Sequence, residues 1–218
     1  MATAKASKAT TGESGLKNLR AKLVGTSPLL MHNIQLASPF SPYSREMSRL
    51  NQEKKRVKKD DEQKIDELLW KMAEVEFKGG LYSDEKIGPF VPSAMLGASI
   101  AKAGGLEGGW GATISRSVFW GPKGFRLDYK GPRTPDELWG EKESFADQRM
   151  VTVGTSKVSR TRPKFEDWST TIEFKFLADQ IGSDMVTQLL NQAGMLVGIG
   201  DGRKLGFGRI EVGDIKIT

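Results

Sequence analysis

Residues 198–212 read GIGDGRKLGFGRIEV, a glycine-dense stretch between a helix-like and a strand-like segment. It holds five glycines and the adjacent pair Arg203-Lys204. Each glycine costs roughly 0.5–1 kcal/mol of extra chain entropy on folding, so this density indicates that something approaches the backbone closely. A phosphate chain is one such object, because backbone N–H groups and nearby cations both bind it. A tight helix-to-strand connection with left-handed residues is the alternative.

The stretch differs from the glycine motifs of nucleotide-binding folds. A P-loop would end in Gly-Lys followed by Ser or Thr, which the stretch lacks. Gly198 and Gly200 match the start of GxGxxG, but Arg203 takes the position of the third glycine. The loop also follows a helix instead of opening one. We therefore expect no nucleotide cofactor, and the sequence indicates no other cofactor.

The segments that flank the loop include clear strand patterns. In residues 168–177, Ile172, Phe174 and Phe176 alternate with the charged residues Glu173 and Lys175. This alternation predicts a strand in which every second residue from Thr170 to Phe176 lies on one buried face. Residues 16–24 alternate in the same way. A final strand is expected over 207–212, with a possible extension at 214–217.

Helix patterns lie between these strands. Residues 184–195 predict a helix capped by Ser183, and residues 93–103 predict a small-residue helix that packs closely against a sheet. A third helix is expected over 61–77, capped by Asp60 or Asp61. The order of elements indicates an α+β fold with a ferredoxin-like, RRM-like core, whose sheet carries helices on one face and leaves the other open to a ligand.

The domain organisation that we expect is one RRM-like domain over 16–218, after a disordered tail at 1–15. Two insertions interrupt it. The first, at about 35–77, is a long mobile basic loop to about residue 60 followed by the helix. The second, at about 104–165, is an irregular lobe with a thumb-like hairpin whose arms are 150–153 and 156–162. The strand order within 104–165 stays open.

Composition limits the possible chemistry. The 218 residues include no cysteine and one histidine, His32, which excludes thiolate metal sites, cysteine nucleophiles and clusters of histidine ligands. No metal site is therefore expected. The longest apolar runs fall short of the roughly 20 residues of a membrane span, and the start lacks the apolar segment of a signal peptide. We expect a cytoplasmic protein without a membrane partner.

The charge balance favours a polyanionic partner. Lys and Arg outnumber Asp and Glu by 33 to 27, for a net charge of +6. The cations gather in three clusters: Arg45 to Lys64, Lys157 to Lys164, and Arg203 to Arg209. Arg160, Arg162 and Lys164 have one parity, so on a strand they would line a single face, as tracking a nucleic-acid backbone requires.

The glycine stretch, read as G-x5-G-aromatic-G followed by a basic residue and a strand, resembles the signature loop of the RAMP superfamily of CRISPR-associated RNA-binding proteins. The matching residues are Gly200, Gly206, Phe207, Gly208, Arg209 and Ile210. The opening segment 23–29 is similar to the first strand and loop of the backbone subunits of that superfamily. The resemblance implies an RRM-like subunit that packs side by side with its copies along guide RNA and kinks the strand at a thumb hairpin. The segment 35–77 has no counterpart in this pattern.

On this interpretation the chain binds single-stranded RNA, or single-stranded DNA, without catalysis. The glycine loop with Arg203 and Lys204 would hold phosphates, the face of residues 160–164 would guide the strand, and the loop at 45–59 would close over it or touch the next subunit. The predicted nucleic-acid-binding residues are His32, Asn33, Arg45, Arg49, Lys54, Lys55, Arg56, Arg160, Arg162, Lys164, Gly200, Gly202, Arg203, Lys204, Gly206 and Gly208. The expected partners are the strand, copies of the chain in a helical or filamentous assembly, and other effector subunits.

Three alternatives remain open from the sequence. His32 could be a general acid or base in a metal-independent endoribonuclease, with Lys54 or another cation stabilising the phosphate. The chain could be a bacteriophage protein that coats single strands. It could also be a structural or interaction protein whose cations serve solubility or an acidic protein partner.

Overall fold

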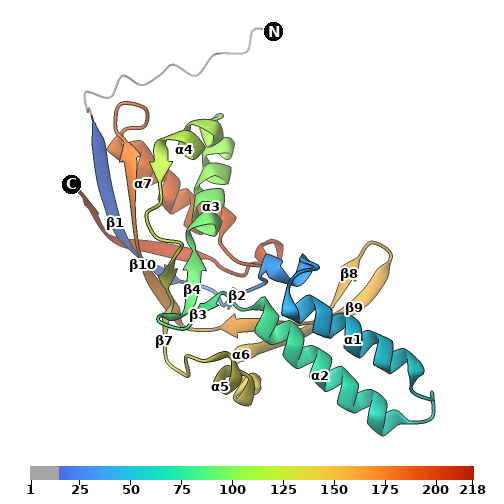
Figure 1. Ribbon diagram of the computed structural model, residues 1–218. Coiled ribbons are helices and arrows are strands. Elements are labelled where there is room, and N and C mark those ends of the chain that lie inside the picture. The colour runs from blue at the N-terminus through green and yellow to red at the C-terminus, as the bar shows by residue number, and fades with distance from the viewer. Residues whose placement is uncertain (1–14) are drawn as a thin grey trace, which may run out of the picture. The chain divides into compact units, whose positions relative to one another are not determined.

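The computed structural model describes residues 15–218, which form two compact units (Figure 1). The first, called the core unit below, comprises residues 15–29, 90–129 and 166–218. The second, called the lobe, comprises residues 30–89 and 130–165. The predicted tail at 1–15 lies outside the described residues, apart from Gly15.

The core unit is built on an antiparallel sheet with the strand order β11-β1-β10-β5. These strands are β1 (Leu16–Gly25), β5 (Val118–Phe119), β10 (Trp168–Leu177) and β11 (Ile210–Ile217). The helices α3 (Ser93–Leu106) and α7 (Ser183–Gln192) fall between them, giving the chain order β1-α3-β5-β10-α7-β11. This βαββαβ order with β1 and β10 in the centre is the ferredoxin-like arrangement, so the predicted fold class is confirmed.

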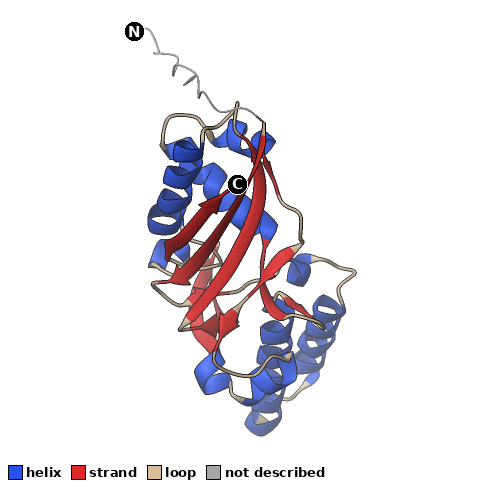
Figure 2. Cartoon of the chain, turned by 90° about the vertical axis from the view of Figure 1, so that its left-hand side faces the viewer, coloured by secondary structure: helices blue, strands red, loops and turns tan. Residues whose placement is uncertain are grey.

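Period-two alternation explains why this sheet has one covered face. On β1, Leu19, Ala21 and Leu23 are buried, while Arg20 and Lys22 between them are exposed. On β10 the buried residues are Trp168, Thr170, Ile172, Phe174 and Phe176, which confirms the predicted face. The helices lie behind the sheet in Figure 2, whereas the other face is open to the viewer.

Shorter elements complete the core unit. They are β4 (Gly88–Pro92, where the chain passes from the lobe), α4 (Gly111–Ser117), β6 (Gly124–Arg126), β7 (Asp128–Tyr129), the π-helix η2 (Ala193–Val197) and the 3-10 helix η3 (Arg203–Leu205). Three details of the prediction were wrong. Gly182, not Ser183, is the N-cap of α7, the final strand begins at Ile210 instead of Phe207, and η2 replaces the end of the predicted helix.

The lobe holds a helical pair and a hairpin. Its elements are η1 (Ile34–Ala37), α1 (Pro42–Arg56), α2 (Glu62–Gly80), β3 (Ser83–Asp84), α5 (Pro135–Gly140), α6 (Lys142–Phe145), β8 (Ala146–Val153) and β9 (Ser156–Phe165); β2 (Leu29–Leu30) lies at its entrance. The hairpin arms were predicted in the right place and are longer than expected. Asp61 caps α2 as predicted, since its side chain accepts the N–H of Lys64.

The predicted mobile loop at 35–60 was wrong, because η1 and α1 occupy most of it. Pro42 starts the helix at a position where its missing N–H is no loss, and ion pairs three and four residues apart support the exposed face. Leu50 is the one buried residue of α1. None of the helices in the described part of the chain has the length and apolar character needed to cross a membrane.

Candidate nucleic-acid interface

The glycine loop is bound to the loop that follows β1, within the core unit. The N–H of Gly208 donates to the Pro28 carbonyl at 2.9 Å. Ser27 Oγ donates to the Gly206 carbonyl and accepts the N–H of Arg209, both at 2.8 Å. The two segments that carry the resemblance to the RAMP superfamily are therefore one structural element.

Close approach explains the glycines, but the approaching object at two of them is the protein's own backbone. A Cβ atom at Gly208 (φ +69°) would lie 1.8 Å from the Ile199 carbonyl oxygen, and one at Gly198 (φ +73°) would lie 2.8 Å from the Gly208 oxygen. A side chain at either position would displace the loop.

The amides of the predicted phosphate-binding glycines have partners inside the core unit. Those of Gly206 and Gly208 bind the carbonyls of Arg203 and Pro28, at 3.1 and 2.9 Å. The Gly200 N–H approaches Met95 Sδ at 3.1 Å, and the Gly202 N–H donates to Asp201 Oδ1 at 2.8 Å. Side chains, more than these amides, are thus available for an anion.

The tip of the loop presents two such side chains. Gly202 and Gly206 take left-handed conformations at either end of η3, which places Arg203 and Lys204 in the turn between them. Both residues are exposed. Neither takes part in an ion pair with a carboxylate in the described part of the chain, residues 15–218. Arg209 Nη2 donates to the Arg203 carbonyl at 3.2 Å and so braces the turn.

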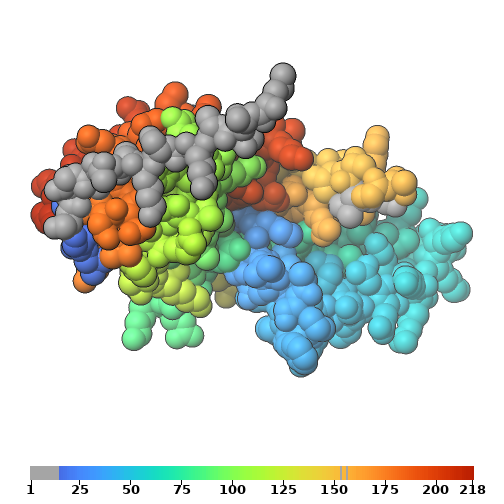
Figure 3. Space-filling model, turned by 90° about the horizontal axis from the view of Figure 1, so that it is seen from above, coloured from blue at the N-terminus to red at the C-terminus, as the bar shows by residue number. Residues whose placement is uncertain are grey.

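The predicted cations of residues 45–56 lie on α1, and part of the surface of this helix is exposed in the space-filling view (Figure 3). Arg49 is held by two carboxylates, with Glu46 at 2.6 Å and Glu53 at 3.0 Å. The hydrogen bonds that Arg49 donates to Glu46 raise the pKa of the Arg49 guanidinium. Much of this arginine's charge is therefore compensated within its own helix.

The other predicted cations of α1 have different surroundings. Arg45 Nε donates to the Pro39 carbonyl at 3.2 Å. Lys54, Lys55 and Arg56 form the last turn, where positive charge stabilises the helix dipole. Lys54 is half-buried, whereas Lys55 and Arg56 are exposed.

The face of β9 that carries Arg160, Arg162 and Lys164 is half-buried, while Thr161 and Pro163 between them are buried. The predicted shared face is thus present. Glu76 of α2 binds β9 at Arg160, and the Glu76 side chain is only 9% exposed. One of its carboxylate oxygens accepts a hydrogen bond from Arg160 Nη1 at 2.8 Å, and the other accepts one from the Thr161 N–H at 2.9 Å. Arg160 is therefore largely neutralised.

The sequence interpretation missed two residues on this face. Arg149 and Asp147 of β8 lie opposite Arg160 and Arg162, and they form an ion pair with each other. The hydrogen bonds that Arg149 donates to Asp147 raise the pKa of the Arg149 guanidinium. Extending the predicted hairpin register by a few residues would have placed both beside β9.

His32 and Asn33 lie at the start of η1. Asn33 is used structurally: Oδ1 accepts the Gln35 N–H at 3.1 Å, and Nδ2 donates to the Leu81 carbonyl at 2.9 Å. His32 is exposed, and its carbonyl accepts from Tyr82 Oη at 3.4 Å.

The geometry of the lobe separates His32 from Lys54. The Asn33 N–H binds the Gly80 carbonyl at the end of α2, whereas Lys54 lies about 18 Å along α1 from Pro42, at 1.5 Å per residue. A histidine and a phosphate-stabilising lysine of one active site must lie much closer than this.

No model of a known protein family matches the sequence, and no curated protein matches it. The solved structures that match the chain include one of the type III-B Cmr-beta bound to cognate target RNA, with a TM-score of 0.47 and 8% identity over 93% of this chain. The match covers 60% of that chain, so the present chain spans less than two thirds of its length. Cmr6 from Pyrococcus furiosus gives a TM-score of 0.32 and 12% identity, over 90% of this chain and 98% of Cmr6.

Proposed function

We propose that the chain is a non-catalytic subunit that binds single-stranded nucleic acid, with the tip of the glycine loop as its main contact to phosphates. The observation that carries this proposal is the braced turn at Arg203 and Lys204. It exposes two adjacent cations, and their backbone is fixed by the hydrogen bonds to the loop after β1. A fixed pair of this kind binds phosphate without the entropy cost of ordering a mobile loop.

The lobe supplies further cations in the proposal. The exposed end of α1, at Lys55 and Arg56, and the β9 residues Arg162 and Lys164 would contact the strand backbone. RNA is the proposed strand because the glycine loop resembles that of the RAMP superfamily. Contacts of this type are tolerant of base sequence and sensitive to salt.

Side-by-side assembly with copies of the chain and with other effector subunits is the second part of the proposal. Three large apolar side chains of the core unit support it, because they lie in or next to the glycine loop and are mostly exposed: Met195 (71%), Leu196 (60%) and Leu205 (68%). Exposed apolar groups of this size indicate a protein contact.

Fluorescence anisotropy with a labelled oligouridine over a range of salt concentrations tests the binding. Arg203→Glu combined with Lys204→Glu should weaken binding at least tenfold and reduce the slope of log affinity against log salt by about 1.4, since about two phosphate contacts to a single strand are lost. The matched control is Lys86→Glu with Lys102→Glu, which makes the same change in net charge at exposed positions outside the three clusters. Equal loss of affinity in both double variants would show that the loop is not the contact.

The strand and the absence of catalysis are tested with the same preparations. The purified protein should retain RNA, which can be extracted and sequenced. Cleavage of that RNA by the wild type but not by His32→Ala would replace the proposal with the endoribonuclease alternative.

A further inference from the structure

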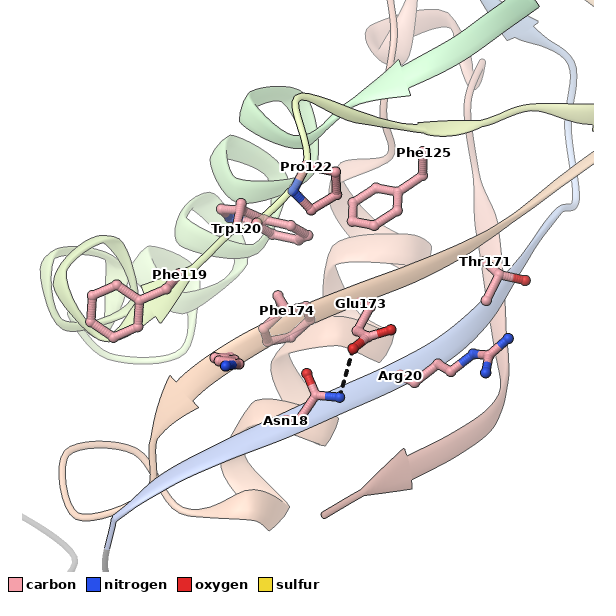
Figure 4. Close-up of a pocket in the computed structure, with 11 residues that line it drawn as sticks. Asn18, Arg20, Phe119, Trp120, Pro122, Phe125, Thr171, Glu173 and Phe174 are labelled. Atoms are coloured by element: carbon pink, nitrogen blue, oxygen red, sulfur yellow. Dashed lines mark hydrogen bonds between the residues drawn. The ribbon is translucent and has the colours of Figure 1, made fainter. Parts of the chain in front are cut away.

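A pocket of about 730 Å³ opens on the exposed face of the core-unit sheet (Figure 4). Its floor is formed by β1 and β10, and its wall is the segment 119–125, which begins at the last residue of β5. The volume lies within the roughly 300–1,000 Å³ of small-ligand sites. No residue of this pocket belongs to the predicted phosphate contacts described above.

The wall of the pocket is aromatic. Trp120 packs against Phe174 with ring centroids 4.8 Å apart, and against Phe125 at 5.9 Å. Phe119 is 47% exposed and lies directly opposite Lys175 of β10 in the strand register. An exposed ring beside an anchored indole offers surface on which a planar ligand can stack.

The floor of the pocket is polar and carries one carboxylate. Glu173 accepts a hydrogen bond from Asn18 Nδ2 at 2.9 Å, drawn as a dashed line in Figure 4. Glu173 and Asn18 are both on the open face, on neighbouring strands. An ionised carboxylate only accepts hydrogen bonds, so a ligand that meets Glu173 must present donors.

The charges around the pocket exclude a cationic ligand and favour an anionic one. Arg20 lies between Glu173 on one neighbouring strand and Lys216 on the other. Lys22 and Lys175 occupy the same face. With these four cations around Glu173, a lysine or arginine side chain of a partner would be repelled, whereas phosphates that flank a base would be attracted.

We propose that this pocket holds one unpaired base of the bound strand, and that Glu173 makes it prefer guanine. Guanine presents two adjacent donors, N1–H and the N2 amino group, which match the two oxygens of a carboxylate. Adenine, cytosine and uracil each present one donor beside an acceptor. In this arrangement the second N–H of the Asn18 amide, which already donates to Glu173, would donate to the guanine O6. The inference rests on the proposed function insofar as the base belongs to a strand.

The test compares an oligouridine with the same oligomer carrying one central guanosine or one central inosine, which lacks the N2 amino group. The wild type should bind the guanosine oligomer about tenfold more tightly than oligouridine, and inosine should lose most of that gain. Glu173→Gln, which removes the second acceptor, should abolish the gain while leaving the binding of oligouridine nearly unchanged. Phe119→Ala should weaken both oligomers severalfold through lost stacking.

Two further outcomes distinguish the pocket from the strand-binding proposal. If oligouridine binds with the expected salt dependence but guanosine gives no gain, or if Glu173→Gln keeps the gain, the guanine pocket is overturned and strand binding stands. If no oligomer binds, strand binding fails, and calorimetry with GMP and UMP decides the pocket alone. GMP binding that is lost in Glu173→Gln would support the pocket as a mononucleotide site, and absence of GMP binding would overturn it.

Discussion

The core unit and the lobe differ in how far their cations are paired with carboxylates. In the lobe, Arg49 lies between Glu46 and Glu53, and Arg160 binds the nearly buried Glu76. In the core unit, Arg203 and Lys204 lie on a turn whose hydrogen bonds are made by the backbone and by the side chains of Ser27 and Arg209. The lobe therefore uses several cations to hold itself together, whereas the loop of the core unit presents them outward.

This difference shows why the density of basic residues in the sequence overstates the lobe as a binding surface. The segment 45–64 has the larger number of cations, but the structure pairs part of them within their own helices. Exposed ion pairs add little stability, yet they do reduce the field that a phosphate meets. The number of uncompensated cations is the better guide to the interface.

The largest expected effect comes from breaking the loop of the core unit. Gly208→Ala should cost about 3 kcal/mol of unfolding free energy, because the new Cβ atom meets the Ile199 carbonyl and the residue has positive φ. Gly206→Ala is the matched control: its φ is +92°, but no heavy atom lies within 4 Å of the added Cβ, so about 1 kcal/mol is expected. Urea unfolding measures both. Equal losses would show that Gly208 does not pack tightly against the backbone of Ile199.

A smaller effect is expected from Glu76→Gln in the lobe. The change leaves Arg160 without its carboxylate and should cost about 2 kcal/mol, measured by urea unfolding. Because it uncovers a cation on β9, it should also tighten oligonucleotide binding if that face contacts the strand. Glu74→Gln is the control, since it makes the same charge change on α2 at the more exposed pair with Lys78. Equal affinities of the two variants would remove β9 from the interface.

The smallest effect concerns Glu67, an exposed carboxylate of the lobe. Hydrogen bonds from Lys71 at 2.5 Å and Lys64 at 3.0 Å lower the pKa of Glu67 from 4.5 to about 2. Since the folded value is the lower one, its small stabilising effect is complete above pH 4.5 and is lost as the pH falls from 4.5 toward 2. Titration of the side-chain carboxyl by NMR should give a midpoint near 2 at low salt. A midpoint of 4.5 would mean that these pairs do not persist in solution.

The sheet of the core unit could be predicted because its strands are amphipathic. Strands β1 and β10 pack against helices on one face only, so their period-two pattern is visible in the sequence. The order of the short strands between 104 and 165 could not be predicted. Strands of two or three residues, such as β5 and β6, are too short to show a pattern.

The helix α1 was missed because its apolar stripe is almost absent, with Leu50 as its one buried residue. The sequence did carry other signals, namely Pro42 after Ser41 and the spacing of Glu46, Arg49 and Glu53. Each is weak alone, and they favour a helix only when they are considered together.

The proposed site could be anticipated in part. Arg203 and Lys204 were predicted because a charged pair inside a glycine loop is a local pattern, and the structure shows both exposed on a turn. The hydrogen bond between the glycine loop and the loop after β1 could not be predicted, because Gly208 and its partner Pro28 are far apart in the sequence. The pocket around Glu173 was hidden for the same reason, since its aromatic wall belongs to the segment whose strand order was open.

The position of β1 in the sheet has a consequence for synthesis on the ribosome. This strand pairs on one edge with β10 and on the other with β11, and both follow in the last quarter of the described chain. This strand therefore leaves the ribosome long before its neighbours, with both edges unprotected while the whole lobe is translated. Such delayed pairing slows folding and exposes a nascent chain to aggregation. A growing polypeptide with this topology should depend on chaperones, or on early binding of its ligand, more than its modest size suggests.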